Sequence, residues 1–299
     1  MRRILLIISL LTIVGVSASA QVQTAEQQSG TLFAYPLAPD TCSTLESRCN
    51  FIIAHFWDNF DISKPITDAA AFERTLRDYV DFFRYAHRNV VLASVRDLVN
   101  KAQSNTSNLQ MLGAVAERAL YGPQAEYWSD EVYIAFIKPL AASKQLPKEE
   151  RERYAAQLAR MNRVQPGAEL DFEFTDIDGN KTRLSALTDS VSIYILLFID
   201  DTTDSTIGRV RLSTDVALNE LINSGQAKLV CLSVNKYSND WASAAAGYAT
   251  NWTFGCGADL KQELDLRSLP CCYLLDSDRT VMNKSMSVET LITAVNSYY

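Results

Sequence analysis

The spacing of apolar residues divides the chain into two parts. From about residue 41 to residue 162, apolar side chains recur at every third or fourth position, which is the period of an amphipathic helix. Phe72, Leu76 and Tyr79 show this spacing. Several helices joined by short polar segments predict an all-α helical domain over residues 36–162.

After "RVQPGAEL" the period changes to two. Apolar and polar residues alternate in "ELDFEF", and Asp178-Gly179 is a turn dipeptide typical of a hairpin. Two nearly unbroken apolar runs, "SIYILLFI" and "AKLVCLSV", are typical of strands buried on both faces. We expect one helix between them, ending near Gly225, and short helices at "DWASAAAGYA" and "ADLKQELDL". The order β-β-β-α-β-α-β-β-α predicts an α/β sheet flanked by helices over residues 163–299.

The first 20 residues have the pattern of a cleaved secretory signal peptide. Arg2 and Arg3 precede an apolar run that ends in the small residues Ala-Ser-Ala at Ala20. The run is short for a membrane span, and an uncleaved N-terminal anchor is the alternative. Residues 21–35 are polar and predict a flexible leader. The mature chain is therefore expected to be exported and to have no membrane span.

Charge and histidine content exclude some classes of function. The net charge is −7 and the Lys and Arg residues form no basic cluster, which argues against a nucleic acid partner. His55 and His87 are the only histidines, so a histidine-based metal site is not expected. No sequence feature indicates a cofactor.

The second half resembles the thioredoxin-like fold of peroxiredoxins and of secreted thiol–disulfide proteins of the TlpA/ResA type. The resemblance covers about residues 166–299 and depends on four segments in order: "PGAELDFEFTDIDGNKTRLSAL", "YILLFIDDTT", "LSVNKYSNDW" and "SLPCCYLLDSDRTVMNKSMSVETL". It implies a helical turn after the first buried strand that carries Cys-x-x-Cys. It also implies a cis-proline facing that turn, and Pro270 stands at this position.

The chain departs from this pattern at the redox turn, where Thr203-Asp-Ser-Thr206 occupies the Cys-x-x-Cys position. The chemistry of the family requires a thiolate whose pKa is lowered at a helix N-terminus. A threonine hydroxyl cannot form a disulfide, and Asp200, Asp201 and Asp204 add negative charge that opposes a thiolate. We therefore expect no redox nucleophile there. Capping of the helix by hydroxyl and carboxylate groups explains the residues, and a cation bound by the three aspartates is an alternative.

Other cysteines leave a redox alternative open. Cys271 and Cys272 directly follow Pro270, and Cys256 is a candidate partner for either of them. Cys42 and Cys49 would lie about 10 Å apart within one helix, too far to bridge, so they can pair only if Cys42 precedes the helix. Cys231, in the middle of a predicted strand, is expected to be a buried free thiol.

The helical part contains the segment "HFWDNFD". His55, Trp57 and Asp58 suggest either a binding cleft or, as we favour, an aromatic anchor with a His–Asp hydrogen bond that holds adjacent helices. Residues 33–162 resemble a helical domain of unknown function that precedes thioredoxin-like domains in exported bacterial proteins, which implies no activity.

The segment "YLLDSDRT" fits a phosphatase motif with Asp276 as nucleophile. Only 19 residues follow Thr280, too few for the rest of such an enzyme, so a hairpin turn is the better interpretation.

Together these features favour a non-catalytic binding or scaffold protein of the bacterial cell envelope, periplasmic or envelope-associated, with an unknown protein or peptide partner. The alternative is a residual thiol–disulfide oxidoreductase or isomerase that uses Cys271 or Cys272. A third hypothesis, an enzyme of another kind around His55, requires a pocket lined by His55 and a second titratable group.

Overall fold

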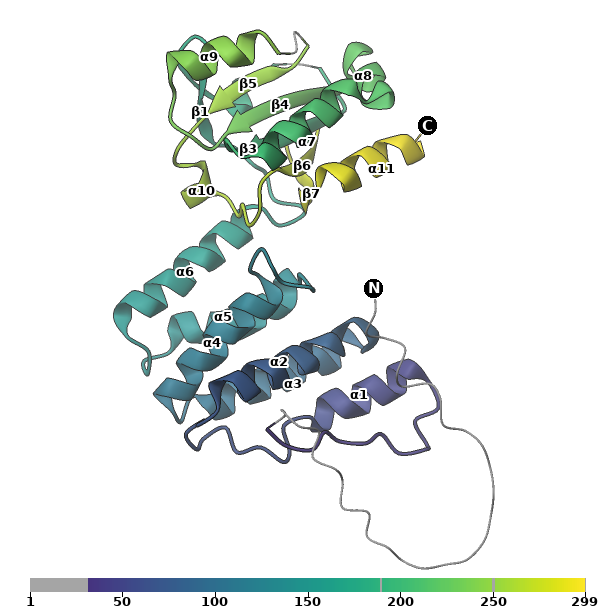
Figure 1. Ribbon diagram of the computed structural model, residues 1–299, viewed down its shortest axis with the longest axis vertical. Helices are drawn as coiled ribbons and strands as arrows, with labels where there is room; N and C mark the ends of the chain where they lie inside the picture. Colours follow the sequence, from purple (N-terminus) through teal and green to yellow (C-terminus); the bar gives the residue numbers. More distant parts are fainter. Residues whose placement is uncertain (1–31, 189, 249–250, 299) are drawn as a thin grey trace, which may run out of the picture.

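The computed structural model describes residues 32–188, 190–248 and 251–298 (Figure 1). The predicted signal peptide and residues 21–31 of the predicted leader lie outside the described residues. No helix in the described ranges is both long enough and apolar enough to cross a membrane.

Six α-helices form the first part. They are α1 (Leu45–His55), α2 (Ala69–Asp81), α3 (Arg88–Ala102), α4 (Thr106–Leu120), α5 (Asp130–Ala142) and α6 (Lys148–Arg163), with a short 3₁₀ turn, η1 (Phe83–Tyr85), after α2. Side chains of the preceding residues accept a backbone N–H at several helix starts, as Asp68 does for α2 and Ser129 for α5. The inward faces of these helices share one apolar core with buried aromatic rings, among them Phe72 and Tyr79.

The second part is a seven-stranded mixed sheet. Its strands are β1 (Glu173–Asp176), β2 (Lys181–Arg183), β3 (Ile193–Ile199), β4 (Ala227–Ser233), β5 (Thr253–Cys256), β6 (Cys271–Asp276) and β7 (Val281–Met286). Their order in the sheet is β2-β1-β5-β4-β3-β6-β7. Strands β3, β4 and β5 are parallel, and the other pairings are antiparallel. The expected all-α region followed by an α/β sheet is therefore confirmed.

Helices cover both faces of the sheet. The helices are α7 (Thr203–Thr214), α8 (Val216–Asn223), α9 (Asn239–Ala246), α10 (Leu260–Glu263) and α11 (Val288–Tyr298), and a 3₁₀ turn, η2 (Leu184–Ala186), follows β2. Apolar residues of α7, α8, α9 and α11 pack on one face, and α10 packs on the other with the segment that follows α6. Figure 1 shows α6 as the helix of the first part that leads into the sheet.

One predicted element was wrong in detail, and one strand was not predicted. The single helix expected up to Gly225 is two helices, because the Asp215 side chain accepts the N–H of Leu218 and starts α8. Strand β5 was not predicted, although it extends the parallel part of the sheet between α9 and α10. It has only four residues, one of them Gly255, so its apolar pattern is weak.

The two hairpins use the same turn chemistry. In the first, Asp176 Oδ1 accepts the N–H groups of residues 178 and 180, and Gly179 has φ +83°. In the second, Asp276 Oδ1 accepts the N–H groups of residues 278 and 280, and Arg279 has φ +63°. Asp276 is thus engaged in a turn, which agrees with the hairpin interpretation of "DSD".

Candidate functional site

The segment after β3 is a capped helix start. Thr202 has extended backbone and precedes α7, and its side chain accepts the N–H of Ser205. Thr203 is the first helical residue, and both Thr203 and Thr206 are exposed. The Thr206 hydroxyl donates to the Thr202 carbonyl over 3.3 Å. The hydroxyl groups therefore satisfy backbone groups at the start of α7, as capping predicts.

Ser205 is the residue of this turn that points inward. It is 1% exposed. Its hydroxyl donates to Asp200 Oδ1 over 2.7 Å and accepts the Asp200 N–H over 3.1 Å. Thr202 caps the helix and Ser205 is buried, and the two are spaced like the cysteines of Cys-x-x-Cys. This pair lies one residue earlier than Thr203 and Thr206. The sequence placed the end of the strand correctly at Ile199, but it could not show that Ser205 turns inward to exchange hydrogen bonds with Asp200.

Asp200 holds the turn together electrostatically. Partial burial raises the pKa of its carboxyl, but hydrogen bonds donated by Thr202 and Ser205 lower it more, so the net pKa lies below the usual value. Such a carboxylate is a weak base for activating the Ser205 hydroxyl. Both histidines of the chain lie in the helical part, away from this turn. Thr202, Ser205 and Asp200 thus form one hydrogen-bonded turn at the start of α7.

The alternative of a cation bound by Asp200, Asp201 and Asp204 finds no support in the geometry. Asp201 and Asp204 are exposed. Within the described ranges, no group of three His, Cys, Asp or Glu side chains is arranged to hold a metal ion.

Pro270 lies directly beside α7. The Leu269–Pro270 peptide bond is cis. A Cβ atom on Gly208 would lie 3.0 Å from Pro270 Cγ and 3.1 Å from Val288 Cγ2. The absence of a side chain at Gly208 therefore allows the close approach of helix and proline. Within the described part of the chain, neither the N–H nor the C=O of Leu269 has a hydrogen-bond partner.

Cys271 and Cys272 are buried thiols on opposite faces of β6. They are 2% and 0% exposed, and they contribute to the two different apolar layers of the domain. Burial raises the pKa of Cys271 to about 12 and the pKa of Cys272 well above its usual value. Both sulfurs are therefore protonated near neutral pH and are shielded from solvent.

The cysteine pairings considered from the sequence are not formed. All six cysteines lie in the described part of the chain, and each is a free thiol. Strands β4 and β3 separate Cys256 on β5 from β6, so about 14 Å of sheet lies between Cys256 and Cys271 or Cys272. Cys42 does precede α1, but it remains unpaired from Cys49.

Cys231 is buried at 1% exposure, and burial raises its pKa to about 12. The expectation of a buried free thiol at this position is confirmed.

The segment around His55 combines an exposed polar pair with a buried tryptophan. His55 Nδ1 lies 2.7 Å from Asp58 Oδ2, but both side chains are about half exposed and belong to one turn. The predicted hydrogen bond is present, yet it does not hold two helices together. Trp57 is buried against Phe33, Phe56 and other rings.

A nearby surface cavity of about 470 Å³ does not have His55 in its lining. Its lining residues are Ala54, Trp57, Asp58, Asn89, Val90, Ala93, Ser94 and Asp97. The pocket that the third hypothesis requires is therefore not formed by this cavity.

Comparisons with known proteins agree with this architecture. Residues 16–164 match the family model described as a domain of unknown function, DUF5106. Curated protein sequences gave no match. A thioredoxin-like protein from Bacteroides caccae has a solved structure that matches with a TM-score of 0.77 and 20% identity, covering 90% of this chain and 99% of that chain.

Two further solved structures each match less than half of the chain. A conserved protein of unknown function from Bacteroides fragilis covers 44% of this chain and 98% of its own length, with 25% identity and a TM-score of 0.40. The thioredoxin domain of a thiol-disulfide oxidoreductase from Bacteroides vulgatus covers 45% and 98%, with 16% identity and a TM-score of 0.36. The chain thus consists of a DUF5106 helical region followed by an α/β domain with the thioredoxin-like fold.

Proposed function

We propose that this protein is a non-catalytic, thioredoxin-like peptide-binding or scaffold protein of the bacterial cell envelope, degenerate at the redox turn. One observation carries the proposal: the turn that begins α7, the helix against which the cis-proline packs, contains hydroxyl groups and no sulfur. This holds whether the Cys-x-x-Cys position is assigned to Thr203 and Thr206 or to Thr202 and Ser205. The nearest sulfurs in sequence to Pro270 are buried and protonated.

Binding would use the main chain beside the cis-proline. The free N–H and C=O of Leu269 can pair with an extended peptide in the manner of an added strand. Main-chain pairing requires no particular side chains of the peptide, which suits an extended segment of varied sequence. Ile207, which is 51% exposed on α7, offers an apolar contact next to Gly208, where the helix packs against Pro270.

The first test measures redox activity in a disulfide-exchange assay with insulin as substrate. We expect no activity above background from the purified chain, and none from a Cys271→Ser/Cys272→Ser variant. Activity in the wild-type chain that the double variant lacks would establish the alternative, a residual oxidoreductase or isomerase. A Thr202→Cys/Ser205→Cys variant is the positive control, because it restores a dithiol at the helix N-terminus.

The second test measures binding. The probe is S-carboxymethylated insulin B chain with a fluorescent label, which cannot exchange disulfides and is largely extended. We expect saturable binding that is lost when a Leu269→Pro substitution removes the free N–H. A wild-type chain that does not bind this probe would contradict the peptide-binding proposal.

A further inference from the structure

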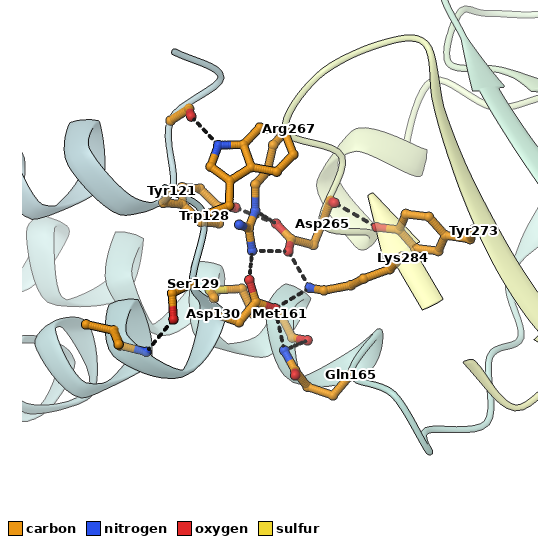
Figure 2. A network of polar contacts seen from close by, with 12 residues as sticks. Tyr121, Trp128, Ser129, Asp130, Met161, Gln165, Asp265, Arg267, Tyr273 and Lys284 are labelled. Carbon is orange, nitrogen blue, oxygen red and sulfur yellow. Dashed lines mark hydrogen bonds and ion pairs between the residues drawn. The ribbon is translucent and has the colours of Figure 1, made fainter. Parts of the chain in front are cut away.

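Four charged side chains meet between the helical region and the sheet domain (Figure 2). Asp130 begins α5 of the helical region, whereas Asp265, Arg267 and Lys284 belong to the sheet domain. Their side chains are 20%, 0%, 2% and 9% exposed, in that order. Two negative and two positive charges make this interdomain charge cluster neutral.

Every member of the cluster has more than one partner. Arg267 Nη2 donates to Asp130 Oδ1 and, over 2.8 Å, to Asp265 Oδ2. Lys284 Nζ lies 2.7 Å from both Asp130 Oδ2 and Asp265 Oδ2. The Tyr121 hydroxyl donates to Asp265 Oδ1 over 2.7 Å. Buried charges are tolerated only when they are paired in this way.

The helical region also supplies the aromatic surface on which Arg267 lies. The guanidinium carbon is 4.3 Å from the centre of the Tyr121 ring and 5.6 Å from that of Trp128. Trp128 is itself fixed, since its Nε1 donates to the Gly122 carbonyl over 2.9 Å. Arg267 is thus held on one side by a carboxylate of α5 and on another by two rings of the helical region.

Arg267 stands three residues before Pro270, in a segment with few bonds of its own. The Asp265 carbonyl accepts the Tyr273 hydroxyl over 2.7 Å, which fixes the start of the segment to β6. Within the described part of the chain, the backbone N–H groups of residues 267–269 make no backbone hydrogen bond. The contacts of the Arg267 side chain are therefore the main restraint on the backbone between Asp265 and Pro270.

We propose that Asp130 and Arg267 are positioning residues that hold Leu269 and Pro270 in the conformation that binds peptide. The helical region then contributes to peptide binding, because its Asp130 positions these two residues. This inference rests on the proposed function for its binding readout, but the positioning itself can be measured without peptide.

The experiment uses trypsin cleavage after Arg267 in the native full chain, with the site identified by mass spectrometry. In the wild type, the buried guanidinium is inaccessible to the protease. Asp130→Asn should raise the cleavage rate at this bond and weaken B-chain binding, each by about tenfold or more, as expected for the loss of a charge-assisted hydrogen bond. Glu131→Gln is the matched control, because Glu131 is the next residue and pairs with Arg88 at the surface of the helical region.

A second variant separates positioning from stability. Asp130→Asn/Lys284→Met restores a neutral cluster, so the midpoint of urea unfolding should return toward that of the wild type. Cleavage after Arg267 should nevertheless stay fast and binding weak, because the α5 carboxylate that pairs with Arg267 is still missing. Wild-type cleavage in Asp130→Asn, or full recovery of cleavage and binding in the double variant, would overturn the inference. A wild-type chain without B-chain binding would instead contradict the proposed function, and the cleavage comparison would still decide the positioning.

Discussion

Asp265 offers the most direct measure of how much the buried charges contribute to stability. Its side chain is fully buried and accepts from Tyr121, Arg267 and Lys284. Asp265→Asn keeps the shape of the side chain but removes its charge, which leaves two cations opposite the single carboxylate of Asp130. Breaking a buried ion pair in this way costs about 3–5 kcal/mol of unfolding free energy. With about 2–4 °C per kcal/mol for a chain of this size, the melting temperature should fall by roughly 10 °C.

The measurements are thermal and urea unfolding of the full chain, both followed by circular dichroism. Glu289→Gln is the control, because Glu289 pairs with Arg211 on the exposed surface and its loss should leave the midpoint unchanged. An Asp265→Asn midpoint equal to that of the control would refute the view that the cluster is desolvated and mutually dependent.

The pH dependence of stability gives an independent check. Burial raises the pKa of Asp265, but the bonds and charges of Arg267 and Lys284 lower it more, so the folded-state pKa lies below the unfolded value of about 3.9. The unfolded state then binds more protons than the folded state, and the contribution of Asp265 is complete above about pH 4. It is lost as the pH falls through the folded pKa. Wild-type stability should therefore fall more steeply on acidification than that of Asp265→Asn, and parallel curves would count against the assignment.

Three further predictions concern the rest of the chain. Ellman's reagent should modify Cys42 in the native state and the five buried cysteines only after unfolding; rapid modification of several thiols would show that the buried sulfurs are accessible. Gly255→Ala should destabilise by about 1–3 kcal/mol, because the added Cβ would lie 2.3 Å from the Phe174 ring; an unchanged urea midpoint would contradict this packing. Arg279→Gly should stabilise by about 0.5–1 kcal/mol, since glycine adopts the left-handed conformation at φ +63° without steric cost; a lower urea midpoint would show that the arginine side chain compensates.

Local patterns predicted the elements whose signals are local. The helical period, the buried strands β3 and β4 and the turn at Asp178-Gly179 are each encoded within one stretch of sequence. Strand β5 was missed because its pattern depends on packing with another strand. Gly255 weakens the strand pattern, yet packing leaves no room there for a side chain, since Phe174 of β1 fills the space.

The site was predictable in composition but not in register. The absence of sulfur from the turn after β3 is visible in the sequence, whereas the inward position of Ser205 depends on its hydrogen bonds with Asp200. The interdomain charge cluster was beyond sequence reasoning. Asp130 and Arg267 are 137 positions apart, and no periodicity relates a residue at a helix start to one in a loop of another domain.

Free thiols throughout the chain have a consequence for how the protein can be produced. No covalent crosslink between cysteines contributes to either half, so folding needs neither an oxidant nor a disulfide catalyst. A version that begins at residue 32 should reach the same native state in a reducing cytosol as in an oxidising compartment. Reducing agents can then be present in every preparation without loss of structure.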